Sequence, residues 1–140
     1  MEELIELRRS IENQNYAEAL QIVDDLAEIL IEDKLNKIYS YMVILLLNLI
    51  KQEVEKKLTR SWEFSIASSV KQINRTNKQR KTGGYYARQK DLEEIIDDAF
   101  EIALKGAAIE VLGGNCSQRK LLNIISKERI IKKVLTLIDH

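Results

Sequence analysis

The chain has 140 residues, with 22 basic and 22 acidic side chains and a formal net charge of zero. This length suits one domain that buries about two thirds of the surface its unfolded form exposes, so we expect a single domain over residues 1–140. The balanced charge argues against a dedicated nucleic-acid-binding domain, and the single cysteine, Cys116, excludes an intrachain disulfide. With only two Phe and one Trp, the core must be mainly aliphatic.

Helix-breaking residues are rare in this chain. Proline is absent, and the five glycines are Gly83, Gly84, Gly106, Gly113 and Gly114. Apolar residues recur at spacings of three and four, which is typical of amphipathic helices. The sequence therefore predicts an all-α fold, a helical bundle of five or six helices with a central apolar helix.

The first half of the chain predicts three helices. Residues 2–12 and 16–31 are amphipathic, and the apolar phase changes at residues 32–34, where we expect a break or kink. A third helix then covers residues 34–57. Because residues 43–47 are apolar on every side, this helix is expected at the centre of the bundle or in the seam of a dimer.

A fourth helix is expected to begin with Ser61 as its N-cap and to end where residues 74–81 begin. Residues 74–84 contain nothing larger and more apolar than Thr, so we expect a mobile loop there. Trp62 lies on the apolar stripe of this helix and is expected in the core.

The fifth helix carries the most regular apolar stripe of the chain, from Leu92 to Val111. Phe100 lies on this stripe and is expected in the core, while Gly106 is expected to let another helix approach closely. Gly113 and Gly114 predict the end of the helix. Residues 115–140 are expected to form a C-terminal helical segment in which Ser126 caps the last helix.

The chain offers few residues for catalysis. The only histidine, His140, is the last residue of the chain, so a nucleophilic pair with Cys116 is not expected. Apart from the paired carboxylates described below, no glycine-rich phosphate loop or recognisable metal-binding signature is present, and no cofactor is expected. The first residues lack the features of a signal peptide, and the most apolar stretch, residues 38–50, is shorter than the roughly 20 residues of a membrane span. We expect a cytoplasmic protein with no membrane association.

Several packing motifs resemble those of a known family. They are the apolar run at residues 43–51, Arg60–Ser61–Trp62 followed by Ile66, and residues 99–103 leading to 107–110. Over about residues 5–112 the chain resembles the all-helical domain-of-unknown-function family twenty-nine, which is abundant in cyanobacteria. The resemblance implies a compact helical domain and supplies no functional residues. Family members often have His at the position of Asn48.

A basic segment without acidic residues covers positions 65–90 and also holds two adjacent tyrosines. Basic and aromatic side chains together are typical of surfaces that bind phosphates and stack bases. The candidate nucleic-acid-binding residues are Lys71, Arg75, Lys78, Arg80, Lys81, Tyr85, Tyr86 and Arg88. The alternative, which the neutral net charge favours, is a loop whose Arg88 and Lys90 pair with the acidic residues of the next helix.

Paired carboxylates suggest a metal site. Asp25 with Glu28, and Glu94 with Asp97, each share a helical face, an arrangement by which all-helical nucleotide pyrophosphohydrolases hold Mg²⁺. The apolar stripe that begins at Leu92 is expected to face the core, so Glu94 and Asp97 on the same helix are expected to face solvent.

The sequence thus favours a non-enzymatic protein-interaction module that acts as a homodimer and binds an unidentified protein partner. The first alternative is a nucleic-acid-associated protein that uses residues 71–90. The second is a Mg²⁺-dependent nucleotide pyrophosphohydrolase. The apolar surfaces expected to pair two chains are residues 43–47 and 121–138.

Overall fold

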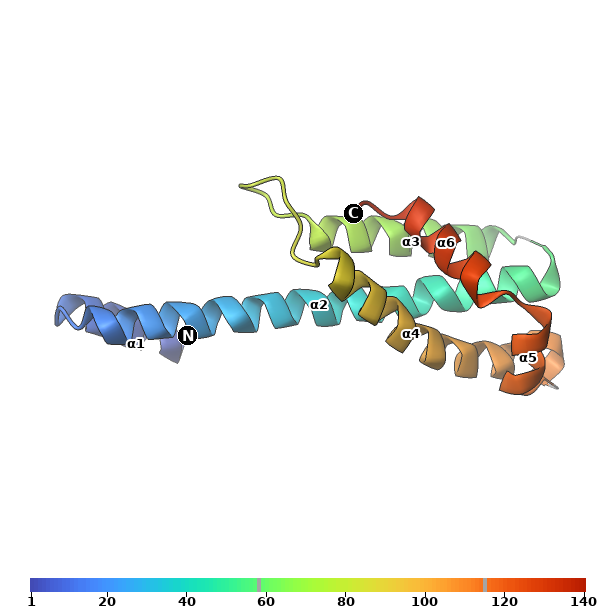
Figure 1. Cartoon of the computed structure of the whole chain (residues 1–140), viewed down its shortest axis with the longest axis horizontal. Coiled ribbons are helices and arrows are strands. Elements are labelled where there is room, and N and C mark those ends of the chain that lie inside the picture. Colours follow the sequence, from blue (N-terminus) through green and yellow to red (C-terminus); the bar gives the residue numbers. More distant parts are fainter. Residues whose placement is uncertain (58, 115) are drawn as a thin grey trace. The chain divides into compact units, whose positions relative to one another are not determined.

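The computed structural model describes residues 1–57, 59–114 and 116–140. These residues form six α-helices and one short 3-10 helix, with no strand among them (Figure 1). The elements are α1 (Glu2–Glu12), α2 (Tyr16–Glu55), α3 (Arg60–Asn77), α4 (Gln89–Glu110), η1 (Val111–Gly114), α5 (Gln118–Ile124) and α6 (Lys127–Leu137). The predicted all-α bundle is confirmed.

The chain divides into two compact units, residues 1–34 and residues 35–140. Helix α2 contributes its first half to unit 1 and its second half to unit 2. Helix α2 is continuous through residues 32–34, so the break predicted there is wrong. No glycine or proline stands there to interrupt the helix. The change of apolar phase marks the boundary between the units instead.

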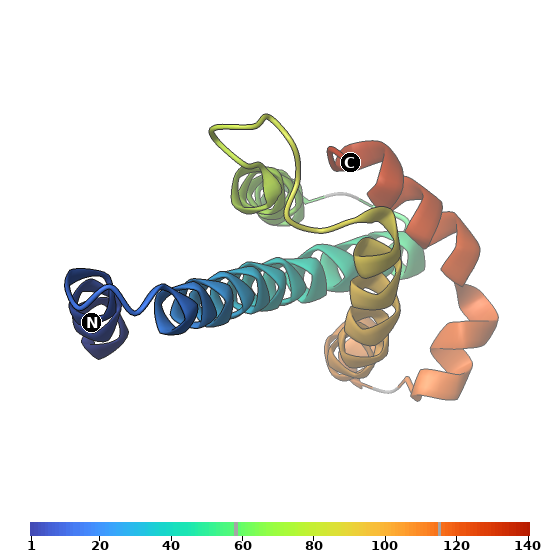
Figure 2. The same cartoon turned by 60° about the vertical axis from the view of Figure 1, so that its left-hand side comes forward.

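Unit 1 is a helical hairpin made of α1 and the first half of α2 (Figure 2). In the turn between them, Gln14 adopts a positive φ of 59°. Asn15 caps α2, since its Oδ1 accepts a hydrogen bond from the Glu18 backbone N–H at 3.3 Å and its Nδ2 donates to Glu18 Oε2 at 2.8 Å. Ser10 and Ala19 are the buried residues, and their small side chains let the two helices approach closely.

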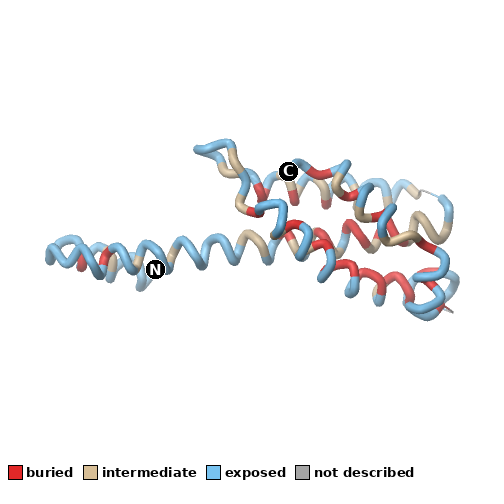
Figure 3. The backbone as a smooth tube through the Cα atoms, viewed as in Figure 1, coloured by how far each residue is buried: buried red, intermediate tan, exposed pale blue. Residues whose placement is uncertain are grey.

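Unit 2 has its core around residues 35–55 of α2, with α3 and α4 on either side of this stretch in Figure 1. Its buried residues are concentrated along these helices (Figure 3). Leu45 and Leu46 are completely buried, whereas Ile44 is 42% exposed. The run at residues 43–47 is thus covered on most sides by the unit's own helices, as expected of a central helix.

Helix α4 buries the apolar stripe that its spacing predicts, including Leu92 at 0% exposure and Phe100 at 3%. A Cβ atom at Gly106 would lie 3.2 Å from Leu47 Cδ1, so the expected close approach of another helix at Gly106 is confirmed. The expected end of the helix is also confirmed. Gly113 and Gly114 follow α4 with φ of 68° and 79°, a backbone region that favours glycine.

The start of α3 differs from the prediction. Thr59 is the N-cap, because its Oγ1 accepts a hydrogen bond from the Trp62 backbone N–H at 3.1 Å, and Ser61 lies inside the helix. Trp62 is half-buried rather than a core residue. The ammonium groups of Lys51 and Lys57 lie 5.2 and 5.9 Å from the centre of its ring, which favours a partly solvated position.

The segment predicted as a loop over residues 74–84 begins later than expected. Residues 74–77 belong to α3, and Thr76 and Asn77 are buried although they are polar. The turn that follows is hydrogen-bonded, with Gln79 N–H donating to Gly84 C=O at 2.7 Å and an antiparallel bridge between Lys78 and Tyr85. The spacing of apolar residues could not predict this burial, because Asn77 is polar and is buried through its hydrogen bonds.

The C-terminal segment is helical, as expected, at residues 118–124 and 127–137. Asn115 lies outside the described residues. Ser117 caps α5, and Ser126 caps α6 by accepting a hydrogen bond from the Arg129 backbone N–H at 3.2 Å. Cys116 is buried, with its Sγ 3.7 Å from the Ser117 carbonyl oxygen. Among the helices described, none is long and apolar enough to cross a membrane.

Candidate interaction surfaces

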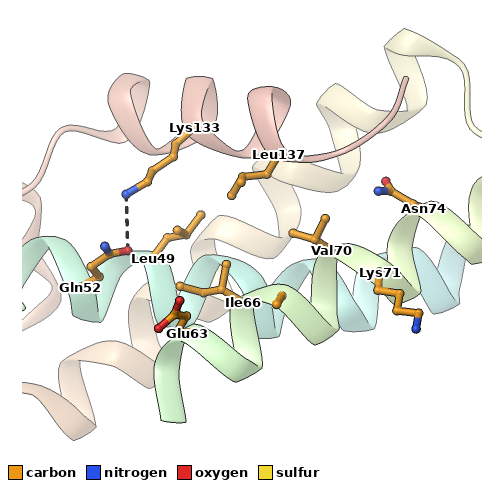
Figure 4. A pocket seen from close by; sticks show the side chains of 10 residues that line it. Leu49, Gln52, Glu63, Ile66, Val70, Lys71, Asn74, Lys133 and Leu137 are labelled. Carbon is orange, nitrogen blue, oxygen red and sulfur yellow. Dashed lines mark hydrogen bonds between the residues drawn. The ribbon is translucent and has the colours of Figure 1, made fainter. Parts of the chain in front are cut away.

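An apolar groove lies in unit 2 between α3 and α6, with α2 as its floor (Figure 4). Helix α3 supplies one wall, because residues 63, 66, 67, 70, 71 and 74 recur at spacings of three, one, three, one and three and so share one helical face. Leu49 of α2 and Leu137 of α6 complete the apolar lining. The groove encloses about 610 Å³ and is lined by Leu49, Gln52, Glu63, Ile66, Ala67, Val70, Lys71, Asn74, Lys133 and Leu137.

Polar groups stand around the edge of this groove. Lys133 Nζ donates a hydrogen bond to Gln52 Oε1 at 3.4 Å, and Asn74 Oδ1 accepts one from the Asp139 backbone N–H at 2.8 Å. These bonds tie α6 and the residues after it to α2 and α3. Glu63 and Lys71 are exposed on the α3 side of the edge and carry opposite charges. The edge can therefore pair with basic and with acidic side chains of a partner. An apolar floor with a polar edge suits the apolar face of an amphipathic helix.

Unit 1 exposes a second apolar surface. Its large apolar side chains are between 43% and 65% exposed, apart from the terminal Met1 at 88% and the half-buried Leu7, Ile22 and Leu26. The exposed ones are Leu4, Ile5, Ile11, Tyr16, Leu20, Val23, Ile29, Leu30 and Ile31. Exposed apolar side chains concentrated in a short stretch of chain are typical of surfaces that contact a partner.

The basic segment is solvent-exposed. Lys71, Arg75, Lys78, Arg80, Lys81, Arg88 and Lys90 are all exposed, Tyr85 is 40% exposed, and Tyr86 is half-buried. In the described part of the chain none of these seven basic side chains forms a salt bridge. The expected pairing of Arg88 and Lys90 with the acidic residues of α4 is therefore not formed. Only the Arg88 backbone N–H donates to Asp91 Oδ2, at 2.9 Å.

The four candidate metal ligands are exposed carboxylates, Asp25 and Glu28 in unit 1 and Glu94 and Asp97 in unit 2. Asp25 Oδ1 accepts a hydrogen bond from Gln21 Nε2 at 3.0 Å, and Asp97 Oδ1 lies 3.7 Å from Lys127 Nζ. Within residues 1–57, 59–114 and 116–140, no group of three or more His, Cys, Asp and Glu side chains is arranged to hold a metal ion.

Sequence reasoning missed the groove and placed the exposed apolar surface elsewhere. The groove arises where residues 66 and 70, which look like ordinary core positions, are left half-buried between two helices. The exposed surface of unit 1 has a sequence signal in the 4,3,4,3 spacing of Tyr16, Leu20, Val23, Ala27 and Leu30, but the same spacing occurs in helices that a larger core covers.

No protein-family model matches the chain, and comparisons with curated proteins and with solved structures find no match either. The resemblance to family twenty-nine stays a prediction that rests on the packing motifs between residues 43 and 110.

Proposed function

We propose that this protein is a non-enzymatic, cytoplasmic protein-interaction module that acts as a homodimer and binds an amphipathic helix of a partner protein in the groove of unit 2. The observation that carries the proposal is the groove itself, where Ile66, Val70 and Leu137 stay partly exposed to solvent around a volume of about 610 Å³. Covering these side chains with a partner's apolar residues is favourable by about 25 cal/mol per Å² of apolar surface.

The shape of the groove supports a helical partner. Its wall is one face of α3 over three turns, from residue 63 to residue 74, and helix-in-groove recognition uses apolar anchors at similar spacings. Phe64 is 74% exposed on the same helix, next to Glu63. An exposed aromatic beside an apolar groove provides an anchor for the edge of such an interface.

A pair of neighbouring residues supplies the test. Ala67 lines the groove, whereas Ser68 is exposed on α3 outside it. Ala67→Arg places a charged side chain in the groove, and Ser68→Arg makes the same charge change one position away. We expect the partner captured by the wild-type chain from its native host to be lost with Ala67→Arg and kept with Ser68→Arg, as measured by quantitative mass spectrometry. Equal capture by both variants would overturn the groove as the binding site.

The exposed basic segment supports a second candidate, association with nucleic acid through residues 71–90. Seven exposed basic side chains, none of which forms a salt bridge with another described residue, are available to phosphates, and Tyr85 offers a ring for stacking. Oligonucleotide binding that weakens steeply with salt, and that the double variant Arg80→Ala/Lys81→Ala weakens further, would support this function. The absence of binding at low salt would exclude it.

The pyrophosphohydrolase stays a prediction from the carboxylate spacing alone. Release of pyrophosphate from nucleoside triphosphates in the presence of Mg²⁺ is its direct test, with Glu94→Gln as the variant that should abolish the activity.

A further inference from the structure

We propose that unit 1 is the self-association element of the protein, and that the hairpins of two copies pack face to face as a four-helix bundle. This inference rests on the homodimer of the proposed function and names the surface that forms it. It replaces residues 43–47 and 121–138 as the expected dimer surface. Leu45 and Leu46 are completely buried within unit 2, and Leu121, Ile130 and Val134 are at most 2% exposed.

The exposed apolar residues of α2 in unit 1 follow a heptad pattern. Tyr16, Leu20, Val23, Ala27 and Leu30 are separated by four, three, four and three residues. This mean spacing of 3.5 keeps all five on one narrow stripe along the helix, which is the seam of a coiled coil. Four of the five are large, and these are between 45% and 65% exposed, so the seam has no partner within unit 1.

A different stripe of α2 packs against α1. Ala19 is buried, and Ile22 and Leu26 are half-buried, at spacings of three and four residues. The hairpin contact and the heptad seam therefore occupy adjacent stripes of the same helix. The hairpin forms without using the seam, which leaves the seam available to a partner.

Helix α1 adds to the same face of the hairpin. Leu7 and Ser10 are its most buried positions and mark the side that faces α2. At 100° per residue, Leu4 and Ile11 then lie about 70° to 90° away from that side, in the same rotational sense as the seam on α2. The two helices are antiparallel. Side chains rotated in the same sense from the contact between the helices therefore lie on the same side of the hairpin. Both helices thus present an apolar flank in one direction, as each half of a four-helix bundle requires.

The exposed apolar area is large enough for the apolar part of a dimer interface. The large side chains of this face are Leu4, Ile11, Tyr16, Leu20, Val23 and Leu30, each between 45% and 65% exposed. Together these side chains expose an apolar area on the order of several hundred Å². In a standard interface each partner buries about 800 Å², a figure that also includes the polar rim. A two-fold axis pairs the same patch with itself, so one exposed surface per chain is enough for closure.

The charges of unit 1 predict how salt acts on this dimer. The unit holds ten acidic and three basic residues, and none of the acidic ones occupies a seam position. Two such units repel each other at long range, whereas their apolar seams attract at contact. Since salt screens the repulsion and leaves the apolar contact intact, the dimer should become tighter as salt is added.

Sedimentation equilibrium of the full chain, with Leu20→Lys and Gln21→Lys as a matched pair, tests the inference. Both residues are exposed and both variants add one positive charge, but only Leu20 lies in the seam. We expect a micromolar wild-type dimer that tightens with salt, a dissociation constant raised at least about tenfold by Leu20→Lys, and little change from Gln21→Lys. Leu20 is 65% exposed, so the variant should keep its fold, and circular dichroism checks this.

Three results would overturn the inference, and they separate it from the homodimer itself. A wild-type dimer that Leu20→Lys leaves unchanged places the interface elsewhere and keeps the proposed homodimer. A dimer that weakens with salt indicates pairing between acidic and basic segments. A monomer at every salt concentration removes both the homodimer and the seam.

Discussion

Asn77 and Ala87 join the two ends of the turn between α3 and α4. The Asn77 side-chain Oδ1 accepts a hydrogen bond from the Ala87 backbone N–H at 2.7 Å, and the Asn77 carbonyl oxygen accepts one from the Tyr86 N–H at 2.8 Å. Asn77 is completely buried, so both bonds are shielded from water. This single residue ends one helix and fixes the chain just before the next.

Asn77→Ala should lower the free energy of unfolding by about 1 kcal/mol. It leaves the buried Ala87 N–H without an acceptor, and this loss is offset in part because the buried Asn77 Nδ2, which has no hydrogen-bond partner among the described residues, is removed as well. Thr82→Ala is the control in the same turn. Thr82 Oγ1 donates to Gln79 Oε1 and accepts from the Gly84 N–H, but both bonds are exposed, so their loss should cost less than about 0.5 kcal/mol. Urea denaturation measures both. Equal effects of the two variants would contradict the structural role of Asn77.

Thr59→Ala should destabilise the protein by about 1 kcal/mol, because it removes the side-chain oxygen that accepts the Trp62 N–H. Ser61→Ala provides the matched control, as Ser61 is exposed within the first turn of α3. Thermal denaturation of the two variants decides which residue caps the helix. A larger loss with Ser61→Ala would restore the cap expected from the sequence.

Phe100→Ala should cost about 3 to 5 kcal/mol, a large part of the stability of an ordinary domain. Phe100 is 3% exposed in the core of unit 2, and Lys127 Nζ lies 5.1 Å from the centre of its ring. Ile109→Ala on the same helix is the control, because Ile109 is 75% exposed. Denaturant melts compare them. A cost below about 1 kcal/mol at Phe100 would show that α4 does not pack through this side chain.

Gly106→Ala should raise the free energy of unfolding by about 0.5 kcal/mol. Alanine favours a helix over glycine by about 1 kcal/mol, and the opposing contact is with the end of the half-buried Leu47 side chain, which can shift. Gly106→Val should instead destabilise by about 1 to 3 kcal/mol, since its extra methyl groups crowd the same contact. A destabilising Gly106→Ala, seen in a thermal melt, would mean that Leu47 is held rigidly.

Limited trypsin digestion should first cut after Arg80 or Lys81, the exposed residues at the tip of the turn. Lys78 should be cut more slowly, because its backbone pairs with Tyr85 in the antiparallel bridge. Mass spectrometry of the fragments orders the cuts. First cleavage inside a helix would show that the turn is better protected than the helices and would count against its mobility.

Much of the helical architecture could be predicted from spacing alone. The stripe of α4 and the close approach at Gly106 depend only on which residues are apolar or small, and both are confirmed. The ends of the helices could be predicted less well. Thr59 and Ser61 are both good capping residues two positions apart, and only the backbone geometry decides which side chain reaches the Trp62 N–H.

Surface features could be predicted least. Helical periodicity shows that a side chain is apolar, but whether it is covered depends on which neighbours pack there. Leu45 and Leu20 look alike in sequence, yet Leu45 is completely buried and Leu20 is 65% exposed. For the same reason the dimer surface expected at residues 43–47 and 121–138 includes side chains that unit 2 buries, whereas most large apolar side chains of unit 1 are exposed. The groove depends on the distance left between α3 and α6, which no local pattern encodes.

The burial of Cys116 gives the protein a built-in reporter of local opening. The thiol is 6% exposed and is the only one among the 140 residues, so a thiol reagent can modify the chain at one position alone. Because the thiol is largely covered, we expect it to react mainly when the region around the start of α5 opens. With excess reagent the labelling rate then measures how often this opening occurs. One colorimetric assay thus follows the fluctuations of the C-terminal segment without any introduced probe.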